Sequence, residues 1–187
     1  MIQQLVQDAP VAIYEIRVED GREWVIPRSD EDWKSLKELY NGPPRAGWRS
    51  PRVRALKEDE GRQLRGSDFP SLASQVLVLS EKACRELEGV LVGQGYLSRL
   101  DTEDGRELWV LAPNAYDCLD EENSRVVRSD EDGRVMVVLR PVFRAPVPNQ
   151  ARIWRLPYTS SPVFASEDFV NAVAEARLEG LEFRRVC

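Results

Sequence analysis

Three Asp-Gly dipeptides stand between short apolar runs, and this pattern constrains the fold more than any other feature of the sequence. They occur at Asp20-Gly21, Asp104-Gly105 and Asp132-Gly133. Asp-Gly is typical of the type I′ turn, because both residues tolerate the left-handed backbone and the turn matches the twist of the flanking strands. Each dipeptide therefore predicts a hairpin, and together they predict a twisted, mostly antiparallel sheet.

The strands follow from the apolar runs on either side of each turn. The paired runs are residues 11–18 with 23–26, residues 96–100 with 107–111, and residues 126–128 with 135–139. A further strand is expected at residues 53–56, inside a basic segment. Short runs bounded by turn residues are the usual signal of strands in an antiparallel meander.

The C-terminal segment, residues 153–187, predicts two short strands, a helix and a closing strand. A serine at the helix start can accept a hydrogen bond from a free amide, and glycine is the residue that most readily ends a helix. The structural residues of this unit are Ser166 at the helix start, Phe169 and Val173 on the buried helix face, Gly180 as the left-handed stop, and Phe183 in the closing strand.

The same order of strand, Ser-Glu and amphipathic helix occurs at residues 76–92. Ser80 is the expected helix start there, and Leu87 lies on the apolar helix face. The two units could be an old duplication or two solutions to the same capping problem.

A third helix is predicted from Ser29 or Asp30 to about Tyr40, with Trp33, Leu36, Leu39 and Tyr40 on its apolar face. The sequence thus predicts an α+β fold, with about three amphipathic helices packed on the sheet. We expect one domain over residues 1–187. Residues 1–66 would supply a hairpin, a helix and a basic loop, and residues 67–187 both strand–helix units.

The chain contains no histidine, which excludes Ser-His-Asp and Cys-His catalysis and the common zinc sites. No glycine-rich phosphate loop is present either. Three cysteines, Cys84, Cys118 and Cys187, are too few for a disulfide framework and suit a reducing compartment. We therefore predict no catalytic residue, no metal and no cofactor.

The formal net charge is −6, which disfavours a generic nucleic-acid binder and suits a partner with a basic surface. No apolar run approaches the length of a membrane span, and the N-terminus lacks the pattern of a signal peptide. These features predict a cytoplasmic protein.

The acids concentrate in residues 101–132, which hold eleven Asp or Glu against three Arg. Three interpretations are open: a solvated turn, a carboxylate-dependent metal-binding hydrolase using Asp117, Asp120 and Glu121, or a negative patch that meets a basic partner. The candidate partner contacts are Asp101, Glu103, Asp104, Glu107, Asp117, Asp120, Glu121 and Glu122.

Residues 45–65 form a basic segment that contains Trp48. Basic residues with an interleaved tryptophan could contact phosphates or stack a base. The alternative is a solvated strand and loop with Trp48 folded onto the core. The acids at residues 58–60 and the net negative charge favour this alternative over nucleic-acid binding.

Several motifs, in this order, resemble immunity-protein family eleven of bacterial polymorphic toxin systems over about residues 67–187. They are Ser67-Asp68-Phe69-Pro70, Val78-Leu79-Ser80-Glu81, residues 117–124 (DCLDEENS), Ile153-Trp154-Arg155-Leu156, Val163-Phe164-Ala165-Ser166-Glu167 and Gly180-Leu181-Glu182-Phe183. The first 60 residues match only in general shape.

The resemblance implies a small cytosolic protein, encoded beside a secreted or contact-delivered toxin, that binds and blocks the toxin in sibling cells. Many toxins of such systems are nucleases, the AHH type among them. Nucleases carry basic substrate-binding surfaces, so an acidic inhibitor is physically sensible. We therefore expect stoichiometric masking of a basic toxin surface, with no enzymatic activity of its own.

Overall fold

The computed structural model describes residues 12–144, 150–158 and 160–186. The helices are α1 (Asp30–Glu38), a 3₁₀ turn η1 (Leu39–Asn41), α2 (Glu81–Glu86), α3 (Glu88–Leu91) and α4 (Glu167–Glu175). The strands are β1 (Ile13–Val18), β2 (Trp24–Pro27), β3 (Arg52–Leu56), β4 (Glu58–Asp59), β5 (Arg62–Gln63), β6 (Leu77–Ser80), β7 (Gly95–Arg99), β8 (Asp101–Thr102), β9 (Leu108–Pro113), β10 (Arg125–Arg128), β11 (Val135–Arg140), β12 (Ile153–Arg155), β13 (Val163–Ser166) and β14 (Leu181–Arg185).

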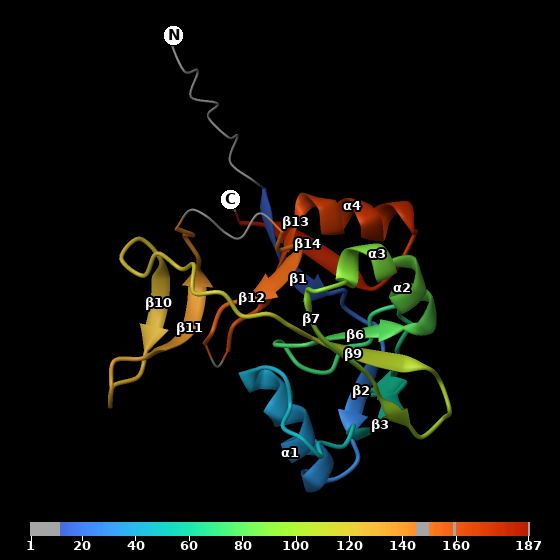
Figure 1. Ribbon diagram of the computed structural model, residues 1–187. Helices are drawn as coiled ribbons and strands as arrows, with labels where there is room; N and C mark the ends of the chain where they lie inside the picture. The colour runs from blue at the N-terminus through green and yellow to red at the C-terminus, as the bar shows by residue number, and fades with distance from the viewer. Residues whose placement is uncertain (1–11, 145–149, 159, 187) are drawn as a thin grey trace.

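The fold is α+β, as predicted, but within the described residues the strands divide among five small sheets (Figure 1). The largest has the order β12-β13-β1-β14, and two three-stranded sheets have the orders β6-β9-β7 and β2-β3-β8. The remaining two are the hairpins β4-β5 and β10-β11. Neighbouring strands run antiparallel, except that β3 and β8 are parallel.

The hairpin predicted at Asp20-Gly21 is wrong. β1 pairs along one edge with β13 and along the other with β14, while β2 pairs with β3. The reason lies in burial: Ile16 belongs to the core shared with the C-terminal strands, whereas Val25 belongs to a second apolar cluster. The turn therefore carries the chain from one sheet to another, and residue 11 lies outside the described residues.

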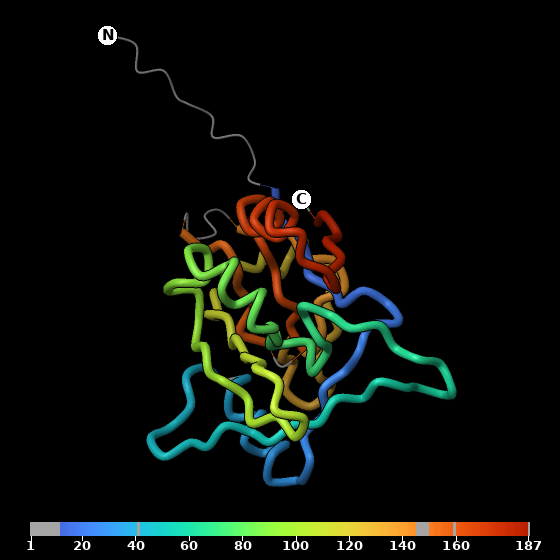
Figure 2. Tube along the Cα trace, turned by 90° about the vertical axis from the view of Figure 1, so that its right-hand side faces the viewer, coloured from blue at the N-terminus to red at the C-terminus, as the bar shows by residue number. Residues whose placement is uncertain are grey.

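The other two Asp-Gly predictions are confirmed. β7 and β9 form an antiparallel pair, with β8 and the Asp104-Gly105 turn between them. β10 and β11 form the hairpin around Asp132-Gly133. The strand expected at residues 53–56 is also present, as β3, and a short hairpin that we did not predict, β4-β5, projects from the body (Figure 2).

Helix α1 starts as expected at Ser29, whose hydroxyl accepts a hydrogen bond from the Asp32 amide. Leu36 and Leu39 are buried, but Trp33 is 38% exposed, so its expected place on the packed face is wrong. The nearly buried Asp32 also accepts a hydrogen bond from the Arg52 amide, at 2.9 Å, and this bond holds α1 against β3.

The two predicted strand–helix units are both present and share one core. Ser80 caps α2 by accepting from the Ala83 amide, and Leu87 is buried where α2 gives way to α3. In the second unit, Phe169 and Val173 of α4 are buried in the same cluster as Leu87, and the Phe183 ring packs edge-on against Phe169.

Two details of the second unit differ from the prediction. Ser166 occupies the start of α4, but its buried hydroxyl makes no capping hydrogen bond. Gly180 does not end the helix: Arg177 adopts the left-handed conformation (φ 51°), and the Leu178 amide donates back to the Val173 carbonyl. The helix therefore ends at Glu175, five residues before Gly180, and the left-handed residue that follows it is Arg177 and not a glycine.

Gly180 instead lies in a tight junction with the Ser67-Asp68 motif. The Asp68 carboxylate accepts from the Ser80 hydroxyl at 3.0 Å and from the Glu179 amide at 3.0 Å. It thus joins the start of α2 to the residues that enter β14. Gly180 has φ +116°, and a β-carbon there would collide with the Ser67 side chain.

We predict that Gly180→Ala destabilises the fold, because both the backbone conformation and the contact with Ser67 exclude a methyl group. The expected loss is about 1–3 kcal/mol, measured by urea unfolding. Gly89→Ala is the matched control: Gly89 lies in α3 with open space around it, so alanine should leave stability unchanged or raise it. Equal stability of the Gly180→Ala and native proteins would contradict the account of this junction.

Candidate functional site

The turn of residues 117–123 precedes β10, and its carboxylates are largely engaged by the protein itself. Glu121 is 2.7 Å from the Arg128 guanidinium and also accepts a hydrogen bond from the Tyr158 hydroxyl, at 3.0 Å. Asp117 is 3.2 Å from Arg144. These pairs neutralise part of the predicted negative patch.

The remaining two acids of this turn differ in their surroundings. Asp120 accepts hydrogen bonds from the amide and the side chain of Asn123, which hold the turn closed and lower the pKa of Asp120. Glu122 is exposed and forms no ion pair within the described residues. Glu122 is therefore the carboxylate of this turn that is most available to a partner.

The Glu121 network also perturbs two titrating groups. Hydrogen bonds from Arg128 and then from Tyr158 lower the pKa of Glu121. Partial burial, followed by the hydrogen bond to Glu121, raises the pKa of Tyr158 to about 12. The network therefore keeps Glu121 ionised and Tyr158 neutral over the ordinary pH range.

The second acidic turn, residues 101–107, shows the same internal pairing. Glu103 lies 3.4 Å from Arg28, Asp104 lies 2.8 Å from Arg106, and Glu107 lies 2.7 Å from Arg99, whereas Asp101 is exposed with no ion pair among the described residues. Arg106 also binds the buried carboxylate of Glu23 at 2.8 Å, which anchors this turn to the body of the protein.

The two acidic turns lie far apart. In Figure 1 the loop between β8 and β9 is at the right of the molecule, and the β10-β11 hairpin with its preceding turn is at the left. The structure therefore does not bring the eight predicted carboxylates into one patch. A partner that binds at one turn would meet four of the eight.

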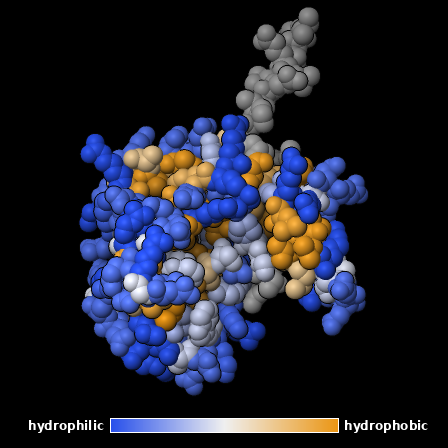
Figure 3. Space-filling model, turned by 180° about the vertical axis from the view of Figure 1, so that it is seen from behind, coloured by the Kyte–Doolittle hydropathy of each residue, from blue (hydrophilic) through white to orange (hydrophobic). Residues whose placement is uncertain are grey.

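The β10-β11 hairpin has one apolar face packed on the protein and a second apolar face that is exposed. Val126 and Val138 face each other across the strands and pack into the third apolar cluster, with Trp154 and Phe164. Val127 and Val137, the next pair, point to the opposite side. Val127 is 45% and Leu139 46% exposed, and Met136 and Val142 are exposed as well. In Figure 3 a hydrophobic patch lies over this hairpin, at the right of the picture.

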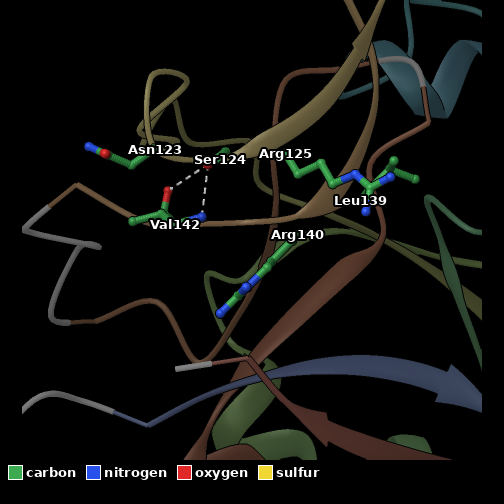
Figure 4. Close-up of a pocket in the computed structure, with 6 residues that line it drawn as sticks. All are labelled: Asn123, Ser124, Arg125, Leu139, Arg140 and Val142. Carbon is green, nitrogen blue, oxygen red and sulfur yellow. Dashed lines mark hydrogen bonds between the residues drawn. The ribbon is translucent and has the colours of Figure 1, made fainter.

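A hollow of about 630 Å³ lies at the open end of the hairpin, lined by Asn123, Ser124, Arg125, Leu139, Arg140 and Val142 (Figure 4). Ser124 and Val142 are joined at this hollow, since the Ser124 hydroxyl accepts from the Val142 amide and donates to the Val142 carbonyl. Arg125 and Arg140 are register partners, and their guanidinium groups point to different sides of the hollow. Among the described residues, neither forms an ion pair.

The sequence also raised a metal-binding hydrolase and nucleic-acid binding by the basic segment, and the structure can be compared with both. The described residues contain no group of three Asp, Glu or Cys side chains placed to hold a metal ion. Trp48 is half-buried, donates to the Ser35 carbonyl and packs edge-on against Tyr96. Its ring is thus occupied within the fold. Cys84 and Cys118 are free thiols, and Cys187 lies outside the described residues.

Among the described residues, no helix has the length and apolar character needed to cross a membrane.

A comparison with protein families shows which family the chain belongs to, which the geometry alone does not give. The model of the Immunity protein family (Imm11) matches residues 48–187, which is most of the chain. The chain belongs to this family. Its role is therefore that of an immunity protein, and its partner is a toxin. The match begins earlier than the motifs at residue 67 had indicated. A search of curated proteins gave no match.

Sequence reasoning found the hairpin but missed its exposed apolar face. The signal was present: Val126-Val127 and Val135 to Leu139 are almost continuously apolar, so one face of a two-stranded hairpin must remain outside. The unpaired state of Arg125 and Arg140 could not be read from the sequence, because it depends on which carboxylates the other arginines reach in space.

We predict that Tyr158 is the last of the five tyrosines to ionise. The measurement is a pH titration monitored by the ultraviolet absorbance of tyrosinate. Because the folded pKa lies above the unfolded value, the stability that it contributes is complete below about pH 10 and is lost as pH rises towards about 12. Tyr158→Phe should remove this late transition. Glu121→Gln should move it to lower pH, and an unchanged transition in Glu121→Gln would contradict the assignment.

Proposed function

We propose that this immunity protein neutralises its cognate toxin by stoichiometric binding in the cytoplasm, covering a surface of the toxin and not converting a substrate. The observation that carries the proposal is membership of the immunity protein family over residues 48–187. The absence of histidine and the exposed apolar hairpin support binding over catalysis.

A toxin with a basic surface is the partner that the charge of this protein suits. The net charge of −6 produces a field that accelerates encounter with a cationic protein, and nucleases, including those of the AHH type, present such surfaces to their substrates. This attraction acts before contact and weakens as salt is added. It therefore governs the association rate more than the lifetime of the complex.

The eight acidic residues divide into two roles under this proposal. Those bound to arginines of this chain, such as Glu121 and Glu107, would have to give up an existing ion pair before binding the toxin. Asp101 and Glu122 would give up none, and Asp120 would give up only its hydrogen bonds from Asn123. We propose that Glu122, beside the hairpin, is the acidic residue closest to the toxin.

The first experiment is the binding of the purified protein to the toxin domain encoded beside its gene. We expect a 1:1 complex by light scattering, and loss of toxin activity in proportion to the immunity protein added. Absence of a complex, or inhibition at far below one equivalent, would contradict stoichiometric masking.

The second experiment compares Glu122→Lys with Asp101→Lys. Both substitutions change the net charge equally and alter an exposed, unpaired carboxylate, but they belong to the two acidic turns, which lie far apart (Figure 1). We expect Glu122→Lys to slow association about 2- to 10-fold at low salt, and more than Asp101→Lys does. Equal effects of the two would show that only the overall field matters, and a larger effect of Asp101→Lys would place the contact at the other turn.

A further inference from the structure

The β10-β11 hairpin presents an outer face that no other described element covers. Its inner face packs on Trp154 and Phe164 through Val126 and Val138, so this face accounts for the attachment of the hairpin to the body. Each of the two strands pairs only with the other in the described sheet. The hairpin is thus half packed, and its outer side and edges are open to a partner.

The outer face is apolar where a solvated hairpin would be polar. Antiparallel strands with one wet face normally alternate apolar and polar residues. Here Val127, Val137 and Leu139 replace the polar residues expected on that side, and Met136 in β11 and Val142 just after it are exposed as well. Contiguous apolar surface of this kind, rimmed by charge, is characteristic of interaction sites.

Two unpaired arginines rim this surface and indicate the charge of what covers it. Like charges directly opposite each other on neighbouring strands destabilise a sheet, yet Arg125 and Arg140 occupy such a pair. The neighbouring Arg128, Arg134 and Arg144 all reach carboxylates of the same region. Arg125 and Arg140 are therefore the cations of the hairpin that remain available for a carboxylate of another molecule.

We propose that the outer face of the β10-β11 hairpin is the toxin-binding surface, and that it receives an apolar ridge of the toxin flanked by acidic side chains. The apolar part would cover Val127 and Leu139. Because the two guanidinium groups point to different sides of the hollow, they would meet two separate carboxylates and not clamp one. This inference rests on the proposed function and names the local chemistry of the partner.

Local and long-range charge then act with opposite sign on the same complex. The whole protein is anionic and favours a cationic partner at a distance, whereas the hairpin favours acidic side chains at the point of contact. Glu122 stands beside this face and belongs to the anionic surroundings that attract the partner, whereas a partner that was basic on the face itself would be repelled by Arg125 and Arg140. Reversing these two charges therefore separates the two possibilities by the direction of the effect.

The test measures binding of the neighbouring toxin domain to Arg125→Glu/Arg140→Glu and, separately, to Leu139→Asp. We expect each to weaken affinity at least ~10-fold, because one loses both ion pairs and the other buries a charge in an apolar contact. The matched controls are Arg49→Glu/Arg54→Glu, at two exposed arginines elsewhere, and Val92→Asp, at a residue 74% exposed. Both controls should bind within ~2-fold of the native protein.

The outcomes are distinct. If the native protein binds the toxin and the hairpin variants, still folded by thermal unfolding, bind equally well or more tightly, the inference is overturned while the proposed function stands. If the native protein does not bind at all, the proposed function fails. A native dimer that Leu139→Asp converts to monomer would assign the surface to a second copy of this chain, which also overturns the inference.

Discussion

The carboxylate of Asp68 holds together two parts of the chain that the rest of the fold depends on. It accepts hydrogen bonds from Ser80, at the start of α2, and from the Glu179 amide, just before β14. Between these points lie the helices of both strand–helix units, which bury their apolar faces in one shared core. Gly180 permits the close approach of Ser67 that this junction requires. The short motif Ser67-Asp68-Phe69-Pro70 therefore has a structural role in this fold.

The β10-β11 hairpin, in contrast to this shared core, has one face that stays exposed. A two-stranded sheet can bury only one face against its own domain, and the buried face here is the one that carries Val126 and Val138. The opposite face is apolar and rimmed by two arginines without carboxylate partners among the described residues. In an immunity protein, whose task is to bind a toxin, such a surface has a direct use. The scaffold and the proposed contact are thus separate parts of the molecule.

Sequence reasoning succeeded where the cause was local and failed where it was not. The cap at Ser80 and two Asp-Gly hairpins depend on a few neighbouring residues, and they are confirmed. The Asp20-Gly21 hairpin failed because β1 finds better-packed neighbours in β13 and β14, far along the chain. The acidic patch was overestimated for the same reason, since a sequence shows carboxylates such as Glu121 but not the arginines that meet them in space.

Hydrogen exchange of backbone amides, compared with and without the toxin domain, tests the central claim most directly. If the outer face of the hairpin is covered, amides of residues 123–142 should exchange more slowly in the complex, while those of residues 101–107 stay unchanged. Slower exchange confined to residues 101–107, with the hairpin unaffected, would contradict the account and place the toxin at the opposite end of the molecule.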